Sequence, residues 1–307
     1  MSKTAIRQFW GDLYRQLYEK NDETLSLDIL EKQIDELEEL FLLRTHSCVV
    51  EMPLEDLAGK KVLEIGSGGG SHSCIFKKRG ADVTAIDITP ERVVSTKLKL
   101  ELLEGIPSRA MQADAENLPF PDDYFDIVYS NGVIHHSPDT ERCVSEIYRV
   151  LKPDGLAVIM LYSRISSAYL FNILPRGVFT GEIFRWPEAE WVGRLTEGKP
   201  KFGNTRNPYT RVYTKKAMLR LFRQFDVTGL RKWSFQFDNF CIPKLTQLRQ
   251  IVLSAIGFSP HRGGILAYGT PFVPETQAER FIGDFLGFCW TITARKPDRP
   301  TSPDPSP

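Results

Sequence analysis

The sequence has few cysteines, and they form no arrangement that would bind a metal. Its five cysteines are scattered and make neither a C-x-x-C pair nor a cluster with histidine; they are Cys48, Cys74, Cys143, Cys241 and Cys289. An odd number of isolated cysteines predicts reduced thiols, no disulfide framework and no metal site.

Long apolar runs are also missing. The longest ones, at 155–162 and 251–258, are far shorter than the roughly 20 residues that a membrane-spanning helix needs. The opening stretch, MSKTAIRQFWGDLYRQ, lacks the apolar core of a signal peptide. We therefore expect a cytoplasmic protein with no transmembrane segment.

The chain has no excess of either charge, because 39 basic residues balance 39 acidic ones. It therefore lacks the positive field that drives binding to a phosphate backbone, and we expect no nucleic-acid partner. The rest of the composition, 307 residues with 42% hydrophobic and 25% charged, is that of an ordinary folded protein. Its length suits one large decorated domain or a core with one smaller accessory part.

The hydrophobic pattern changes near residue 60. Residues 23–44 carry apolar side chains at helical spacing, which predicts an amphipathic helix in an N-terminal cap. After it, short runs rich in β-branched residues alternate with helical patterns, which predicts a parallel sheet covered on both faces. The expected strands are 61–66, 82–87, 125–130 and 156–162, and the expected helices between them are 71–79, 90–103 and 138–151.

The second half of the chain is less regular. We expect a helix at 214–225, a strand near 226–237, a last strand at 287–296 and a Pro-rich disordered tail. The predicted organisation is a helical N-terminal cap (1–58), a cofactor-binding core (59–162), a substrate-cap insert (163–213), the C-terminal part of the sheet (214–296) with an insert at 238–286, and the tail (297–307).

A glycine-rich turn follows the first predicted strand. Gly66, Gly68 and Gly70 alternate there, and a helix begins directly afterwards. Such a turn lets a ligand lie against the main chain and close to a helix N-terminus. A dinucleotide fingerprint would need Gly or Ala where Ser71 stands, which argues against an NAD-dependent oxidoreductase. Asp87 ends the second strand, where an acid that binds a ribose is expected in either cofactor class.

Five ordered segments together carry a family resemblance: VLEIGSGGG, the strand ending at Asp87, ADAENLPF, NGVIHH and RVLKPDG. In this order the chain resembles the class I S-adenosylmethionine-dependent methyltransferases, in particular the small-molecule group with an I/L-H-H motif after strand four. The resemblance covers about residues 60–162. It implies an α/β, Rossmann-like sheet of seven strands, mostly parallel with the last antiparallel. The inserts after strands five and six are features of this sequence, and the second stands where the family usually has a short hairpin.

The resemblance also implies which residues bind S-adenosylmethionine. Asp87 would accept the ribose hydroxyls and Asp114 the adenine amino group, and Asn131 would hold the methionine end. Glu64 would orient the amino-acid part, although an acid at a sheet end also caps backbone amides. The full predicted set is Glu64, Gly66, Ser67, Gly68, Gly70, Asp87, Ile88, Asp114, Ala115 and Asn131.

Two histidines follow the fourth strand and are the candidate catalytic residues. His135 and His136 should lie at the carboxyl edge of the sheet, where open α/β folds bind ligands. A histidine suits general-base work if the acceptor must lose a proton, and we favour His135 because it is nearer the strand end. Alternatively, one histidine packs beneath the cofactor and the other caps the next helix.

The acceptor must be selected outside the cofactor-binding core. Segment 206–214 gathers the predicted substrate-binding residues, which together with one residue from the fifth strand are Tyr162, Arg206, Tyr209, Arg211 and Tyr213. Arginine pairs with carboxylate or phosphate, so we expect an anionic group on an aromatic or apolar acceptor. Asn207-Pro208-Tyr209 is similar to the N/D-P-P-Y motif of amino methyltransferases, but it lacks the second proline and lies well past the fifth strand.

These observations predict an S-adenosylmethionine-dependent methyltransferase that modifies an oxygen or nitrogen of a small molecule in specialised metabolism. The alternative is a non-catalytic S-adenosylmethionine-binding regulator or partner subunit. The insert at 238–286 is compatible with a lid, a homodimer surface or a membrane-docking edge, and the sequence does not choose between them.

Overall fold

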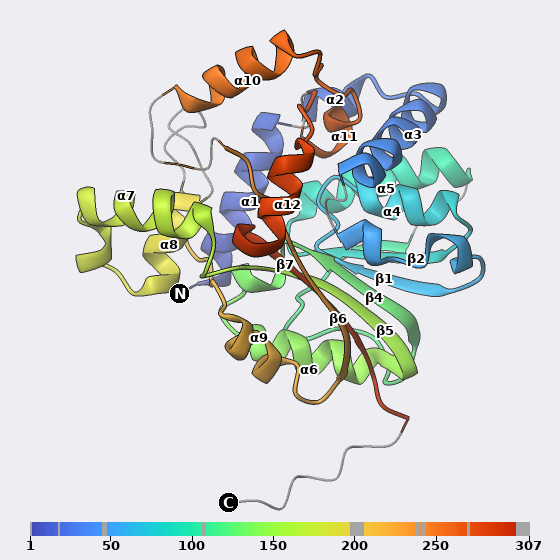
Figure 1. Cartoon of the computed structure of the whole chain (residues 1–307). Coiled ribbons are helices and arrows are strands. Elements are labelled where there is room, and N and C mark those ends of the chain that lie inside the picture. The colour runs from blue at the N-terminus through green and yellow to red at the C-terminus, as the bar shows by residue number, and fades with distance from the viewer. Residues whose placement is uncertain are drawn as a thin grey trace, which may run out of the picture.

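The computed structural model describes residues 2–17, 19–44, 48–105, 109–196, 206–237, 240, 244–268 and 271–298. Its centre is a seven-stranded sheet in the order β3-β2-β1-β4-β5-β7-β6 (Figure 1). The strands are β1 (Lys61–Ile65), β2 (Asp82–Asp87), β3 (Arg109–Gln112), β4 (Phe125–Asn131), β5 (Leu151–Tyr162), β6 (Asp226–Trp233) and β7 (Cys289–Arg295). Strands β1 to β5 run parallel, and β7 is antiparallel to both of its neighbours. The predicted mostly parallel sheet with an antiparallel last strand is confirmed.

Helices cover both faces of the sheet (Figure 1). The helices of the first half are α1 (Lys3–Leu17), α2 (Glu19–Glu23), α3 (Leu27–Arg44), α4 (Ser71–Lys78), α5 (Pro90–Glu104) and α6 (Thr140–Val150). Those of the second half are α7 (Leu174–Phe179), α8 (Glu188–Thr196), α9 (Lys215–Leu221), α10 (Leu245–Ala255), α11 (Gly264–Tyr268) and α12 (Gln277–Leu286). A π-helical turn (Tyr169–Ile173) and short 3-10 turns (Cys48–Glu51, Leu54–Asp56, Ile134–His136 and Glu182–Phe184) join them.

Alternation along the strands sends side chains into two separate cores. In β1, Val62 packs with α3 and α4, whereas Leu63 and Ile65 pack on the opposite face with α6 and α9. These strand side chains are almost completely buried, as expected when both faces of a parallel sheet are covered. The carboxyl ends of β1, β2 and β4 therefore meet at one edge that is held from both sides.

The boundaries of β5 and α9 differ from the sequence-based expectation for physical reasons that the structure shows. Strand β5 begins at Leu151 instead of 156, because the chain stays extended through a bulge opposite Phe125 and Ile127, with Asp154 at φ 58°. Helix α9 ends at Leu221, short of the predicted 225. The chain leaves helical geometry at Phe222, and Phe222 and Phe225 turn into the core beside α6.

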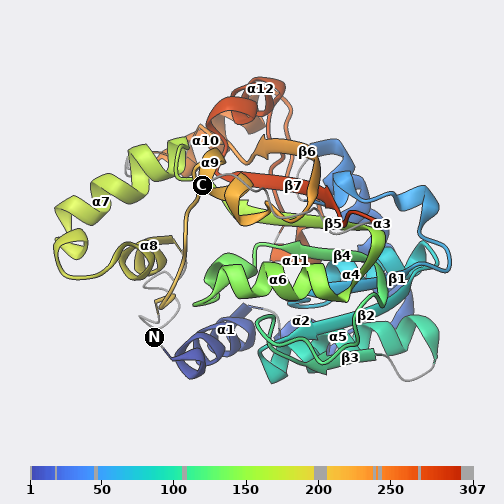
Figure 2. The same cartoon turned by 90° about the horizontal axis from the view of Figure 1, so that it is seen from below.

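The two inserts extend from the body of the fold (Figures 1 and 2). The segment after β5 carries α7 and α8 and projects to the left in both views. The segment after β6 carries α10, α11 and α12, and α10 exposes Leu248, Ile251, Val252 and Ile256. Among the helices that the structure describes, none is both long and apolar enough to cross a membrane. Most of the predicted tail, 299–307, lies outside the described residues.

Candidate active site

The glycine turn after β1 is compact because its neighbours leave no room for side chains. Gly66, Gly68 and Gly70 all have positive φ values, of 74°, 57° and 80°, which other residues rarely adopt. A Cβ at Gly66 would overlap the side chain of Val133, and one at Gly70 would lie 2.9 Å from Cα of Thr96. The turn is therefore pressed between the loop after β4 and helix α5.

Asp87, at the end of β2, is fixed by the backbone around it. Its Oδ2 accepts the N–H of Gly68 at 3.0 Å, and its Oδ1 accepts the N–H of Thr89 at 2.9 Å. The residue is 5% exposed. Each carboxylate oxygen keeps a second lone pair, so the group can still accept hydrogen bonds from a ligand.

A cavity of about 230 Å³ opens at this edge of the sheet. Its wall combines the glycine turn, the ends of β2 and β4, the loop after β3 and the first turns of α1. Predicted cofactor residues on the wall are Gly66, Ser67, Gly68, Asp87, Ile88, Asp114, Ala115 and Asn131. These side chains come from four separate strand ends, and the fold brings them to one surface.

Two predicted cofactor residues lie behind the wall. Gly70 packs against α5, as described above. Glu64 is 1% exposed; it accepts a hydrogen bond from the Ser73 hydroxyl, and its Oε1 lies 3.4 Å from Nδ1 of His72. His72 itself is on the cavity wall and stacks on Phe41. The carboxylate of Glu64 therefore holds the first turn of α4, including His72.

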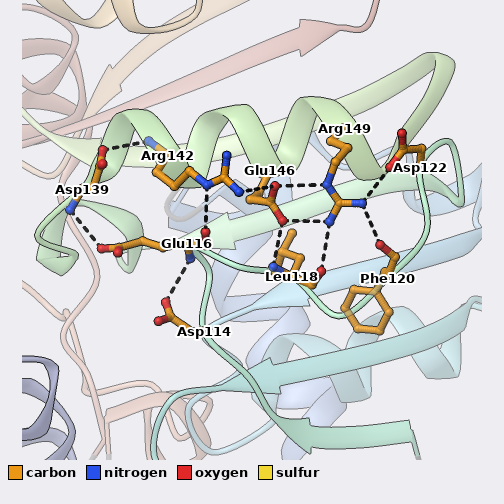
Figure 3. Close-up of polar contacts among 9 residues, drawn as sticks. All are labelled: Asp114, Glu116, Leu118, Phe120, Asp122, Asp139, Arg142, Glu146 and Arg149. Atoms are coloured by element: carbon orange, nitrogen blue, oxygen red, sulfur yellow. Dashed lines mark hydrogen bonds and ion pairs between the residues drawn. The ribbon is translucent and has the colours of Figure 1, made fainter.

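A polar network fixes the loop that carries Asp114 and Ala115 (Figure 3). Arg149 of α6 binds the carbonyl oxygens of Leu118 and Phe120, and it also pairs with Glu146. Glu146 accepts the N–H of Leu118 at 2.9 Å. The hydrogen bond from Arg149 lowers the pKa of Glu146, which keeps the pair ionised. The network attaches the loop to α6 along its length.

His136 is on the cavity wall and His135 is not. The Nδ1 of His136 lies 3.1 Å from the Tyr209 carbonyl oxygen, 3.0 Å from Thr210 Oγ1 and 3.1 Å from Asn207 Nδ2. Its Nε2 is buried, with no hydrogen-bond partner among the described residues. Burial lowers the pKa of His136 to about 4, so the ring is neutral at pH 7.

His135 is completely buried behind that wall. Its ring lies 4.2 Å from the ring of His136 and 4.1 Å from that of Tyr162, measured between centroids. Neither ring nitrogen has a hydrogen-bond partner within the part of the chain that the structure describes. Burial holds the pKa of His135 well below its usual range. Its position suits packing behind the wall, and of the two histidines only His136 lines the cavity.

The predicted substrate-binding residues lie outside the cavity wall. Arg206 pairs with Glu182 at 3.5 Å. Arg211 donates to the Pro138 carbonyl oxygen at 2.9 Å and to the Tyr209 hydroxyl at 2.8 Å. The Tyr213 hydroxyl is buried, and the ring of Tyr162 is partly buried between His135 and Phe288. Segment 206–214 therefore packs behind the histidines, and its arginines are engaged within the protein.

Several wall residues were not anticipated from the sequence. Lys3, Ile6 and Trp10 of α1 cover the cavity, and Arg92 and Leu266 complete it. Lys3 Nζ lies 2.5 Å from carboxylate oxygens of both Asp114 and Glu116. Trp10 meets the His136 ring edge to face at 5.0 Å. The helical spacing of Ile6, Trp10 and Tyr14 was a signal for an amphipathic helix, but it does not indicate which element that helix covers.

Comparison with known proteins agrees with this geometry. A family profile described as a methyltransferase domain matches residues 63–159. The chain is 33% identical over 171 residues to a protein of Pseudomonas savastanoi pv. phaseolicola named ubiquinone biosynthesis O-methyltransferase, a match that covers 51% of this chain and 73% of that protein. A protein of the same name from Pseudomonas aeruginosa is 34% identical over 172 residues, with 51% and 73% covered.

The fold has a counterpart among solved structures. A chain of the complex between the Haloferax volcanii Trm112 methyltransferase activator and a methyltransferase superposes with a TM-score of 0.53 and 16% identity. The match covers 95% of this chain and 98% of that one. At this identity the likeness concerns the fold alone. The family profile and the curated relatives show that the chain belongs to the class I S-adenosylmethionine-dependent methyltransferases and that S-adenosylmethionine is its cofactor.

Proposed function

We propose that this enzyme transfers the methyl group of S-adenosylmethionine to an oxygen atom of a small-molecule acceptor held beside His136. The observation that carries the proposal is the single cavity in which the glycine turn, Asp87 and Asp114 share a wall with His136 and Trp10. Cofactor and acceptor can therefore meet in one enclosed space. The named activity of the curated relatives, O-methyl transfer, favours oxygen over nitrogen as the acceptor atom.

The residues on the wall fit S-adenosylmethionine. The Asn131 Oδ1 is a buried acceptor with no partner among the described residues, and it suits the ammonium of the methionine part. The free lone pairs of Asp87 suit the two ribose hydroxyls. Asp114 and Ala115 lie where the adenine would be placed, with Ile88 beside them. When bound, the cofactor supplies an electrophilic methyl group on a sulfonium.

The acceptor side of the cavity is mostly apolar. Ile6, Trp10 and Leu266 contribute apolar surface, which supports an aromatic or apolar acceptor. Methyl transfer depends mainly on holding the nucleophile in line with the methyl group, so a rigid wall contributes directly to the rate. His136 is rigid because three groups of segment 207–210 surround its Nδ1.

An anionic group on the acceptor remains part of the proposal, but with a different partner. Arg92 is on the wall, whereas Arg206 and Arg211 are not. The Arg92 guanidinium lies 5.0 Å from the Trp10 ring, and no carboxylate of the described chain forms an ion pair with it. We therefore expect Arg92 to face any carboxylate or phosphate that the acceptor carries.

Calorimetric titration with S-adenosylmethionine and S-adenosylhomocysteine tests the cofactor site. We expect Asp87→Ala to abolish binding, because it removes the carboxylate that faces the ribose. Asp82→Ala, at the other end of the same strand, should bind as the wild type does. Binding that survives in Asp87→Ala would contradict the assignment.

A second experiment tests transfer itself. Cell extract is incubated with the protein and methyl-labelled S-adenosylmethionine, and labelled small molecules are separated and identified. We expect a labelled methyl ether or ester. If the protein binds the cofactor but labels nothing in extract, a non-catalytic binding protein becomes the better description.

A further inference from the structure

The environment of His136 determines more than its position, because it also constrains where the ring carries its proton. A neutral imidazole has one N–H and one bare nitrogen. Nδ1 of His136 faces two groups that can donate, the Asn207 amide and the Thr210 hydroxyl, and one that can only accept, the Tyr209 carbonyl. The tautomer therefore depends on which of these three groups has no other hydrogen-bond partner.

The orientation of the Asn207 side chain is settled by its own neighbours. The backbone N–H of Tyr209 donates to Asn207 Oδ1 at 3.1 Å, so the NH₂ group must occupy the other side. That NH₂ has two hydrogens, and it contacts two acceptors: Thr210 Oγ1 at 3.0 Å and His136 Nδ1 at 3.1 Å. Asn207 is fully buried, so no solvent water can replace either acceptor.

Satisfying both hydrogens of Asn207 requires Nδ1 of His136 to be bare. If Nδ1 carried the proton, it could donate to the Tyr209 carbonyl, but one N–H of the fully buried Asn207 would have no acceptor. With the proton on Nε2, the N–H that lacks a protein partner belongs instead to a ring on the cavity wall, where a ligand can accept it. Orphaned buried N–H groups are rarer in proteins than under-satisfied carbonyl oxygens. The single lone pair of the bare Nδ1 then accepts from Asn207, and the Thr210 hydroxyl has Thr196 Oγ1, at 3.4 Å, as its own acceptor.

We propose that Asn207 and Thr210 hold His136 in the tautomer with its proton on Nε2, so that His136 donates a hydrogen bond to the acceptor rather than removing a proton from it. Nε2 is on the edge of the ring away from segment 207–210, and the ring lines the cavity. The inference rests on the proposed function, in which an acceptor oxygen lies beside this ring. Asn207 and Thr210 are then positioning residues, and His136 is the residue that contacts substrate.

A donating His136 narrows the class of acceptor. The oxygen that faces Nε2 must present a lone pair, as a carboxylate or an ionised hydroxyl does. Such an oxygen forms the new O–C bond with its own electron pair, the electrons of the broken S–C bond stay on sulfur, and no proton has to be removed. Arg92 lies near enough to disfavour a charged His136, and its charge stabilises an oxyanion in the same place.

Nitrogen-15 NMR of the full-length protein labelled in histidine tests the tautomer at pH 7 without any acceptor. Protonated and bare imidazole nitrogens resonate far apart, and the His136 signals are assigned by their absence in His136→Gln. We expect a protonated Nε2 and a bare Nδ1. The opposite pattern in the wild type would overturn the proposal, whether or not the methyl-transfer experiment succeeds.

An isosteric variant tests the role of Asn207. Asn207→Asp replaces the donating NH₂ with an accepting oxygen, so we expect the proton to appear on Nδ1. Asn172→Asp, an equivalent change in the segment before α7, should leave the His136 signals unchanged. If Asn207→Asp folds with the wild-type pattern, Asn207 does not set the tautomer; if it does not fold, the wild-type spectrum alone decides.

Discussion

At the scale of single residues, the site depends on buried polar groups whose partners are few. His135 and His136 are both neutral and almost fully enclosed, and Asp87 is held by two backbone amides. Burying such groups is costly unless each finds a partner. Two of the buried polar atoms that have no partner within the described chain, Asn131 Oδ1 and His136 Nε2, belong to residues on the cavity wall, where a ligand can provide one; the ring nitrogens of His135 lie behind it.

The donor role of His136 predicts a difference between two isosteric replacements. His136→Gln keeps an N–H near the position of Nε2, whereas His136→Glu offers only a base. We expect the glutamine variant to be at least about tenfold more active than the glutamate variant, as steady-state kinetics with the acceptor found in extract can measure. Higher activity in the glutamate variant would indicate general-base catalysis, whose loss typically costs about 10²–10⁴-fold.

Burial of His136 predicts loss of stability in acid. Its pKa is lowered to about 4 in the folded protein, mainly by burial, and is near 6.5 in an unfolded chain. The unfolded state therefore binds the extra proton first as the pH falls below about 6.5. We expect this histidine to lower the free energy of unfolding by about 2 kcal/mol when the pH falls from 7 to 5.

Urea unfolding at the two pH values measures that cost. The wild type should lose more stability on acidification than His136→Gln, which has no imidazole to protonate. Equal losses in the two proteins would contradict the lowered pKa. The His136→Gln substitution itself lowers the stability by the same amount at both pH values. This difference cancels when the loss on acidification is compared between the two proteins.

At the scale of elements, two segments that line the cavity are the glycine turn and α1. The turn is confined by Val133 and Thr96, and α1 is attached through Lys3 and through Trp10. The turn is built locally, next to β1. Helix α1 lies near the start of the chain and reaches the same place only through the fold (Figure 2).

Because the turn is confined, we expect Gly66→Ala to impair the protein more than the strain of its positive φ alone would. Gly66 and Gly105 both have positive φ, of 74° and 67°, so alanine is strained at either position. A Cβ at Gly66 also overlaps Val133, whereas Gly105 has open space around it. We expect Gly105→Ala to lower the free energy of unfolding by about 1 kcal/mol, which urea unfolding measures. Gly66→Ala should lose stability and also lose cofactor binding, which calorimetry measures.

The contact of Trp10 with His136 predicts a kinetic role for α1. Trp10→Ala removes the ring that covers His136 and Arg92 and admits water to the cavity. We expect kcat/KM to fall by about tenfold or more, which corresponds to about 1.4 kcal/mol of lost transition-state stabilisation. Trp186→Ala, a change at an exposed tryptophan away from the cavity, is the control, and equal effects of the two variants would remove α1 from the site.

At the scale of the whole molecule, the cavity collects residues from α1, four strand ends, α5 and α11. A ligand that binds there contacts parts of the chain that are otherwise connected only through the core. Such a ligand binds the folded state and not the unfolded one, so it stabilises the entire protein by mass action.

S-adenosylhomocysteine at one hundred times its Kd should therefore raise the melting temperature. The stabilisation is about 2.7 kcal/mol at that concentration, which at roughly 2–4 °C per kcal/mol for a domain of this kind is about 5–10 °C. Differential scanning fluorimetry measures the shift. Asp87→Ala should show none, and an equal shift in that variant would place the ligand elsewhere.

The sequence by itself determined the cofactor half of the site. The glycine turn, Asp87, Asp114 and Asn131 each lie directly after a strand, and parallel strands end at a common edge. Their meeting therefore follows from local patterns and one rule of topology. The seven-stranded sheet with its antiparallel last strand was implied by the family resemblance that the order of the motifs carries.

Only the tertiary structure decided which side chains line the rest of the cavity. His135 and His136 are adjacent in the sequence, and the choice between them depends on segment 206–214, which packs against both from about seventy residues away. Another part of the cavity wall is formed by residues of α1 and by Leu266. Contacts between such distant segments are set by the packing of whole helices on the sheet, which no local pattern of residues records.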